Sequence, residues 1–142
     1  MKKTSPILLT KEKIIKHFDF IERGKLYSFL LYTISLVTPV SENNFGFIYL
    51  AIGWMGIADP EFIIFSFVPW LSNLTYFITL FCPRELVRIR LAISGTTTIF
   101  SLFSIGFFLE ESSAPIIGFY LWISSYLTIF IHAILLNRIS KK

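Results

Sequence analysis

Long apolar stretches separated by short polar segments dominate the chain from residue 25 onward. A helix that crosses a bilayer needs about 20 mostly apolar residues. Four stretches meet this requirement: residues 25–41, 62–81, 91–109 and 116–136. A fifth apolar run, residues 45–57, is too short to cross and contains two glycines after its first turn. The pattern predicts four transmembrane helices and, between the first two, a short interfacial or re-entrant helix.

The first 24 residues follow a different pattern. Ile14, Phe18 and Ile21 recur at steps of four and three, which places them on one face of a helix, and lysines occupy other faces. Thr10 can cap the start of this helix, and Gly24 can end it. We therefore expect residues 1–24 to form an amphipathic cytoplasmic segment on the membrane surface, and residues 25–142 to form the membrane domain. A docking site for a cytoplasmic partner is the alternative for the segment.

The composition agrees with a lipid environment. Hydrophobic residues make up 54% of the 142 residues, and 16 of them are phenylalanine, which is more than a soluble core of this size can bury. The fold class that we expect is an all-α membrane protein, a bundle of four transmembrane helices. One cysteine leaves no pair for a disulfide or for dithiol redox chemistry. The basic residues flank apolar stretches instead of forming one patch, which argues against nucleic acid as a partner.

The positions of the basic residues predict the topology. All thirteen fall in three groups, seven in residues 1–25, three in residues 84–90 and three in residues 138–142. Cytoplasmic loops next to spans carry the excess of Lys and Arg. Four spans with both termini inside place every one of these groups in the cytoplasm. We therefore expect a multi-pass protein of a bacterial inner membrane, with cytoplasmic N- and C-termini.

Each predicted span carries one stripe of small or polar residues at helical spacing, and such residues mark helix contacts in membranes. The four stripes are Ser28, Tyr32, Ser35 and Pro39; Ser66, Pro69, Asn73 and Tyr76; Ser94, Thr97, Ser101 and Ser104; and Gly118, Trp122, Ser125 and His132. We interpret the stripes as packing surfaces. The alternative is a water-lined pathway along the third stripe.

Candidates for chemistry inside the membrane are few. His132 near the end of the fourth span and Asn73 in the middle of the second are the most polar side chains, and we expect both to make structural hydrogen bonds. Ser125 lies about 10 Å along the helix from His132, so the pair cannot act as nucleophile and base. None of the predicted spans contains a carboxylate. We predict no catalytic, metal or cofactor site.

The outer loop between the first two spans is the most distinctive surface. Trp54 and Trp70 flank the acidic residue Glu61 in this region. Tryptophans at this depth are typical of an aromatic belt at the membrane interface. The alternative is a recognition surface, because aromatic anchors with acidic flanks are suited to contact with a partner.

Four short motifs carry a resemblance to a known group. They are TPV at Thr38, GWMG at Gly53, WLSN at Trp70 and GFYLWISS at Gly118. Their layout over residues 26–136 resembles that of small four-span bacterial inner-membrane proteins of unassigned function. The architecture is also similar to that of immunity proteins against pore-forming bacteriocins. The resemblance implies no catalytic residues.

The sequence therefore predicts a non-enzymatic membrane protein that acts by contact. Its expected partners are the lipid bilayer and another membrane protein or toxin, and a homo-oligomer is compatible with the pattern. The alternative function is a small oligomeric channel or transporter subunit that uses the third stripe. Burial of that stripe against other helices would favour the contact function, and exposure to water would favour the channel.

Overall fold

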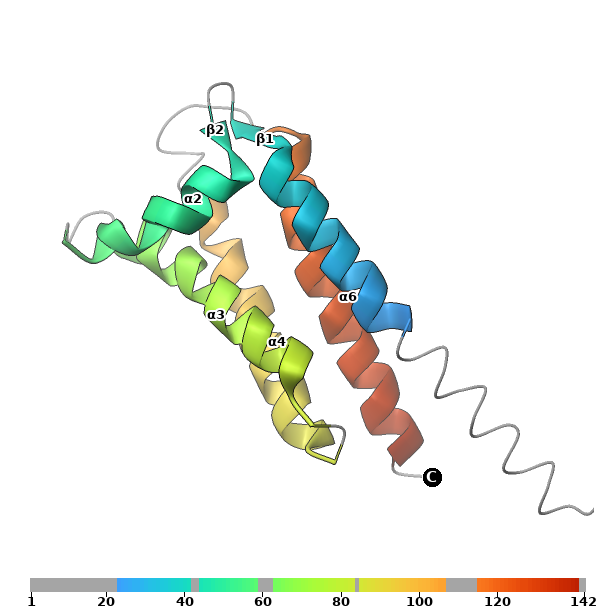
Figure 1. Cartoon of the computed structure of the whole chain (residues 1–142). Coiled ribbons are helices and arrows are strands. Elements are labelled where there is room, and N and C mark those ends of the chain that lie inside the picture. Colours follow the sequence, from blue (N-terminus) through green and yellow to red (C-terminus); the bar gives the residue numbers. More distant parts are fainter. Residues whose placement is uncertain (1–22, 42–43, 59–62, 84, 107–114, 141–142) are drawn as a thin grey trace, which may run out of the picture.

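The computed structural model describes residues 23–41, 44–58, 63–83, 85–106 and 115–140, and these residues are mostly helical (Figure 1). Three helical segments are long and apolar enough to cross a membrane: Ile63–Phe81, Val87–Gly106 and Ile117–Ser140. They confirm the prediction of long apolar helices for the second, third and fourth apolar stretches. Residues 23–37 form a further helix. The rest of the predicted N-terminal amphipathic helix lies outside the described residues.

The long helices lie side by side. Helices α3 (Val68–Phe81) and α4 (Val87–Leu102) form an antiparallel pair joined by a short turn. Helix α6 (Ile117–Ser140) packs against α4, and the helix of residues 23–37 runs along α6 (Figure 1). The start of the 23–37 helix, the α3–α4 turn and the end of α6 point toward the same end of the bundle. We call this the basic end, because Arg23, Arg88 and Arg138 belong to these segments.

The opposite end is formed by a small hairpin, and we call it the hairpin end. Strand β1 (Pro39–Ser41) pairs antiparallel with β2 (Asn44–Phe45). The predicted first span of residues 25–41 is therefore helical only as far as residue 37. Proline disfavours helix in the residue before it and has no N–H to donate, so Pro39 ends the helix and permits the turn. The hairpin also holds α6, because the Ile116 N–H donates to the Val40 carbonyl at 3.0 Å.

A short apolar segment follows the hairpin, as the sequence predicts for residues 45–57. It consists of α2 (Gly46–Ile52) and the 3₁₀ helix η1 (Gly53–Ala58). This segment lies across the hairpin end at an angle to the long helices (Figure 1). The Trp70 indole N–H donates to the Leu50 carbonyl at 2.8 Å and ties the segment to α3. Its length and its placement both distinguish it from the long helices.

The second apolar stretch begins with a wider turn. Residues Ile63–Phe67 form the π-helix η2, which continues directly into α3. Pro69 lies in the first turn of α3 and has no N–H with which to make the ordinary helical hydrogen bond. π turns occur mostly as short insertions within α-helices, as η2 does here directly before α3. The helix therefore remains continuous although its pitch changes.

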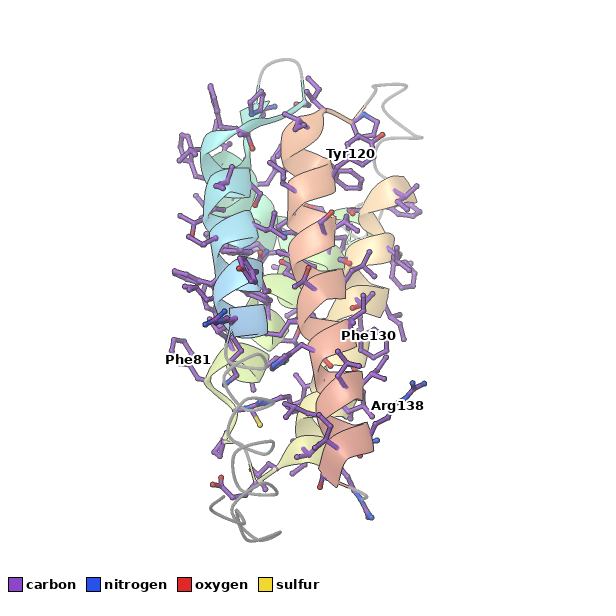
Figure 2. The ribbon with its side chains drawn as sticks, turned by 90° about the vertical axis from the view of Figure 1, so that its right-hand side faces the viewer. Phe81, Tyr120, Phe130 and Arg138 are labelled. Carbon is purple, nitrogen blue, oxygen red and sulfur yellow. The ribbon has the colours of Figure 1, made fainter. Side chains whose placement is uncertain are left out.

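The distribution of side chains is the reverse of that in a soluble protein. In the described part of the chain, the fully buried side chains are mainly serine, threonine and tyrosine, whereas the exposed large side chains are mainly Phe, Leu and Ile. Phe81 and Tyr120, both on the outside of the bundle in Figure 2, are 79% and 57% exposed. A surface of this kind is stable in contact with lipid hydrocarbon and not with water.

Candidate functional site

A polar cluster around Asn73 lies at the centre of the bundle. The Asn73 Oδ1 atom accepts hydrogen bonds from the Tyr32 hydroxyl at 2.9 Å, the Tyr126 hydroxyl at 2.8 Å and the Trp122 indole N–H at 3.1 Å. Its Nδ2 atom donates to the Trp70 carbonyl at 3.0 Å. One amide oxygen thus joins α3 to α6 and to the 23–37 helix. An amide oxygen has two lone pairs, so the three donors share them and leave none for a further donor.

Three tyrosine rings pack next to this cluster. Tyr32 stacks on Tyr76 with ring centroids 4.8 Å apart, and Tyr126 lies 5.1 Å from Tyr76. The Tyr76 hydroxyl shares a hydrogen bond of 3.0 Å with Ser28 Oγ, which also donates to the Ser125 carbonyl at 2.8 Å. These polar atoms are therefore paired with one another inside the protein, which is what a low-dielectric interior requires.

The polar stripe of α4 is buried as well. Ser94, Thr97 and Ser101 have no exposed surface, and Ser104 is 7% exposed. The Ser94 and Ser101 hydroxyls donate to carbonyls of their own helix, at 3.0 Å and 2.8 Å. Thr97 also donates to the Thr75 hydroxyl of α3 at 2.8 Å. In the described structure this stripe is a packed contact between helices.

A pocket of about 370 Å³ opens between the helices at the hairpin end. Its walls come from the 23–37 helix, α2, η1, η2, α3, α6 and the end of the Val87–Gly106 segment, and they are mostly aliphatic or aromatic. The aromatic residues that line it are Tyr49, Phe65, Trp70, Phe119 and Trp122. Asn73 is the innermost residue of α3 in the lining, so the polar cluster forms part of the floor. This size and composition are typical of a site for an apolar group with one polar anchor.

The structure brings some of the predicted site residues together and separates others. Trp70, Asn73, Ser104 and Trp122 all line the pocket. Trp54 lies outside it on η1 and is 52% exposed, with its indole N–H donating to the Ala51 carbonyl. These positions give the hairpin end both a recessed and an exposed aromatic surface.

Two further predicted residues lie elsewhere. His132 is buried in the part of α6 nearer the basic end, where its ring faces Gly24 so closely that an added Cβ there would lie 2.8 Å from Cδ2. Glu61 lies outside the described residues. Because His132 lies near the basic end, it does not contribute to the pocket at the hairpin end. Within the described ranges, no three His, Cys, Asp or Glu residues come together in an arrangement that could hold a metal ion.

Two residues of structural importance are missing from the sequence prediction. Tyr126 donates to Asn73 and is fully buried, and it follows the predicted residue Trp122 by four positions. The charge pattern predicts that Arg90 lies in a cytoplasmic loop, but only 1% of its surface is exposed. The spacing contains a signal for it, because Arg90 precedes Ser94 by four residues and thus continues the stripe of α4.

Comparisons with known proteins identify no relative. No family model, no curated protein and no solved structure matches the chain. The functional inference below therefore depends on the contacts of this structure and on the sequence pattern.

Proposed function

We propose that the chain is a four-span protein of a bacterial inner membrane that works by contact with another membrane component. The 23–37 helix is the proposed first span. Together with the turn at residues 38–39 that follows it, this helix lies beside α6 from His132, which Gly24 faces, to Gly118, which approaches the Pro39 carbonyl. This stretch of α6 covers about 21 Å at 1.5 Å per residue, which is most of the hydrocarbon thickness. The basic end is then cytoplasmic, in agreement with the positions of the Lys and Arg residues.

The burial of the α4 stripe is the main observation that supports a contact function. A channel or carrier needs polar groups that face water, whereas Ser94, Thr97 and Ser101 have no exposed surface. Among the described residues, the pocket and the exposed face of η1 around Trp54 lie together at the hairpin end and are available to a partner. A partner that presents an aliphatic or aromatic group to this end would fit the pocket. Another membrane protein or a pore-forming toxin is such a partner, and the resemblance to immunity proteins agrees with this choice.

The proposed topology predicts the results of reporter fusions. Fusions after residue 88 and at the C-terminus should show cytoplasmic reporter activity, because the Lys and Arg groups hold these segments inside. Fusions near residues 59 and 112 should show periplasmic activity. Alkaline phosphatase and green fluorescent protein fusions at each position measure the two outcomes. A periplasmic result at residue 88 would contradict both the orientation and the four-span count.

The contact function predicts where a partner can be crosslinked. A photoreactive amino acid at position 54 should give a discrete adduct in living cells, because Trp54 is exposed at the hairpin end. Position 78 is the matched control, since Ile78 is 55% exposed and Trp54 is 52% exposed, but Ile78 lies on α3 toward the basic end. Position 78 should give only diffuse adducts with lipid. The adducts are measured by immunoblotting of membrane fractions and by mass spectrometry.

A flux assay distinguishes the alternative function. Liposomes that contain the purified protein should show the same ion leak as empty liposomes, because the α4 stripe is buried. A leak that disappears when Thr97 is replaced by leucine, together with equal adduct patterns at positions 54 and 78, would reject the contact function in favour of a channel.

A further inference from the structure

Arg90 is a buried cation whose hydrogen bonds are incomplete. Arg90 is the fourth residue of α4. Its Nη2 group donates to the carbonyl of Cys82, the residue that follows α3. The Nε and Nη1 groups are buried and have no hydrogen-bond partner within the described residues. Arg88, two residues earlier on the same helix, is exposed. The two arginines therefore differ in environment although they have the same charge.

A buried guanidinium needs an anion. A guanidinium is a positive charge, and a buried charge without a partner strongly destabilises a protein. The only carboxylate in the described part of the chain is that of Glu85, which is exposed on the α3–α4 turn. The anion that completes the Arg90 site therefore does not come from the described residues.

The start of α4 is a second, independent feature that attracts an anion. Its N-cap residue, Leu86, makes no side-chain capping hydrogen bond, and the first turn contains no acidic residue. The first N–H groups of a helix lack partners inside the helix, and they carry a partial positive charge. Such N–H groups are a frequent binding site for phosphate. Side chains on a helix lean toward its N-terminus, and the bond to Cys82 places the Arg90 guanidinium at this end of α4.

We propose that Arg90 and the N-terminus of α4 bind the phosphate group of an anionic phospholipid at the basic end of the bundle. The planar guanidinium can donate two parallel hydrogen bonds to a phosphate, one from Nε or Nη1 and the other from the second hydrogen of Nη2, which the Cys82 carbonyl does not use. Leu86 and Ile89 are 43% and 50% exposed, so apolar surface for the acyl chains lies beside the site. The exposed charges of Arg88 and Arg138 raise the local concentration of anionic lipid. The site lies at the other end of the bundle from the pocket and does not depend on the contact function.

The test compares Arg90→Gln with Arg88→Gln in nanodiscs of phosphatidylcholine, with and without phosphatidylglycerol. Anionic lipid should raise the melting temperature of the wild-type protein by about 5 °C, as one charge-assisted contact would. Arg90→Gln should lose most of this increase. Arg88→Gln removes the same charge from an exposed position and should keep most of it. Equal losses in the two variants would show only general attraction to a charged surface, and the proposal would be wrong.

A second measurement covers the case in which Arg90→Gln does not fold. Arg90→Lys keeps the charge but not the planar fork, and it should reduce the amount of phosphatidylglycerol that native mass spectrometry detects on the protein. The wild-type protein and Arg88→Gln should each retain one such lipid. Equal lipid retention by Arg90→Lys and the wild-type protein would contradict the proposal.

Two further experiments distinguish a lipid phosphate from other sources of the anion. Millimolar inorganic phosphate should not raise the melting temperature in phosphatidylcholine nanodiscs, and an equal increase would assign the site to a free anion instead of a lipid. A variant with Glu12→Gln, Asp19→Asn and Glu22→Gln should keep the response to phosphatidylglycerol. The alternative outcome is that, in nanodiscs of phosphatidylcholine alone, this triple variant has a melting temperature as low as that of Arg90→Gln. The anion is then a carboxylate of the N-terminal segment, and the lipid site is rejected.

Discussion

Replacement of Asn73 by leucine is expected to lower the free energy of unfolding by about 2–4 kcal/mol. Leucine has the same number and branching of side-chain heavy atoms, but it leaves the Tyr32 and Tyr126 hydroxyls and the Trp122 indole N–H without their common acceptor. These donors lie in an interior where unpaired polar groups are costly. The measurement is unfolding in mixed detergent micelles by added sodium dodecyl sulfate, followed by tryptophan fluorescence.

The same substitution at Asn137 is the matched control. Asn137 is half-buried near the basic end of α6 and lies outside the Asn73 cluster, so Asn137→Leu should change the stability by less than about 0.5 kcal/mol. Tyr126→Phe removes one donor and should cost about 0.6 kcal/mol. In the Asn73→Leu background, Tyr126→Phe should cost nothing further. Additive losses in this double-mutant cycle would show that the tyrosine and the amide are not coupled.

Gly118→Ala is expected to cost about 1–3 kcal/mol, the usual cost of overpacking. A Cβ at this position would lie 2.6 Å from the Pro39 carbonyl oxygen and 2.8 Å from that of Thr38. Both neighbours are backbone atoms. They cannot move aside without disturbing the hairpin, because Thr38 and Val40 accept hydrogen bonds from Gly46 and Ile116. The same detergent titration measures the loss.

Gly95→Ala provides the comparison within the same bundle. Its Cβ would meet only the flexible side chain of Phe130, at 3.4 Å. Alanine favours a helix over glycine by up to about 1 kcal/mol, so this variant should be neutral or slightly stabilised. Similar losses at Gly95 and Gly118 would mean that the close approach of the Thr38 and Pro39 carbonyls to α6 does not limit the packing.

The helices of this protein can be predicted from the sequence because each segment that crosses lipid must by itself be long and apolar enough to do so. A stretch such as residues 116–136 is apolar on most faces, and its length alone identifies it as a spanning helix. The small residues Ser28, Ser35 and Ser125 occupy buried positions at the expected helical spacing. Helical periodicity predicts the face of the helix on which a residue lies, but it does not predict which residue of another helix that side chain contacts. The convergence of Tyr32, Tyr126 and Trp122 on one oxygen could therefore not be predicted.

Local conformations and the depth of charged groups were harder to predict. Pro39 indicates the end of a helix, but the pairing of β1 with β2 depends on contacts with α6, which lies far along the chain. Arg90 was assigned to a loop because positive charges near span ends are usually exposed in the cytoplasm. Its burial follows instead from its position on the α4 stripe, one turn before Ser94, where the helix faces its neighbours.

The pairing of the first helix with the last imposes an order on the assembly of the protein. Helices α3 and α4 are joined by a short turn and can pair as soon as both are synthesised. Ser28 and Ser125 are 97 residues apart, so the Ser28 hydroxyl cannot donate to the Ser125 carbonyl until α6 is synthesised. On the proposed four-span topology, the face of the first helix that packs against α6 is in contact with lipid until then, and the nascent chain is exposed to membrane chaperones and proteases. Truncation before α6 should therefore give a chain that inserts but is rapidly degraded.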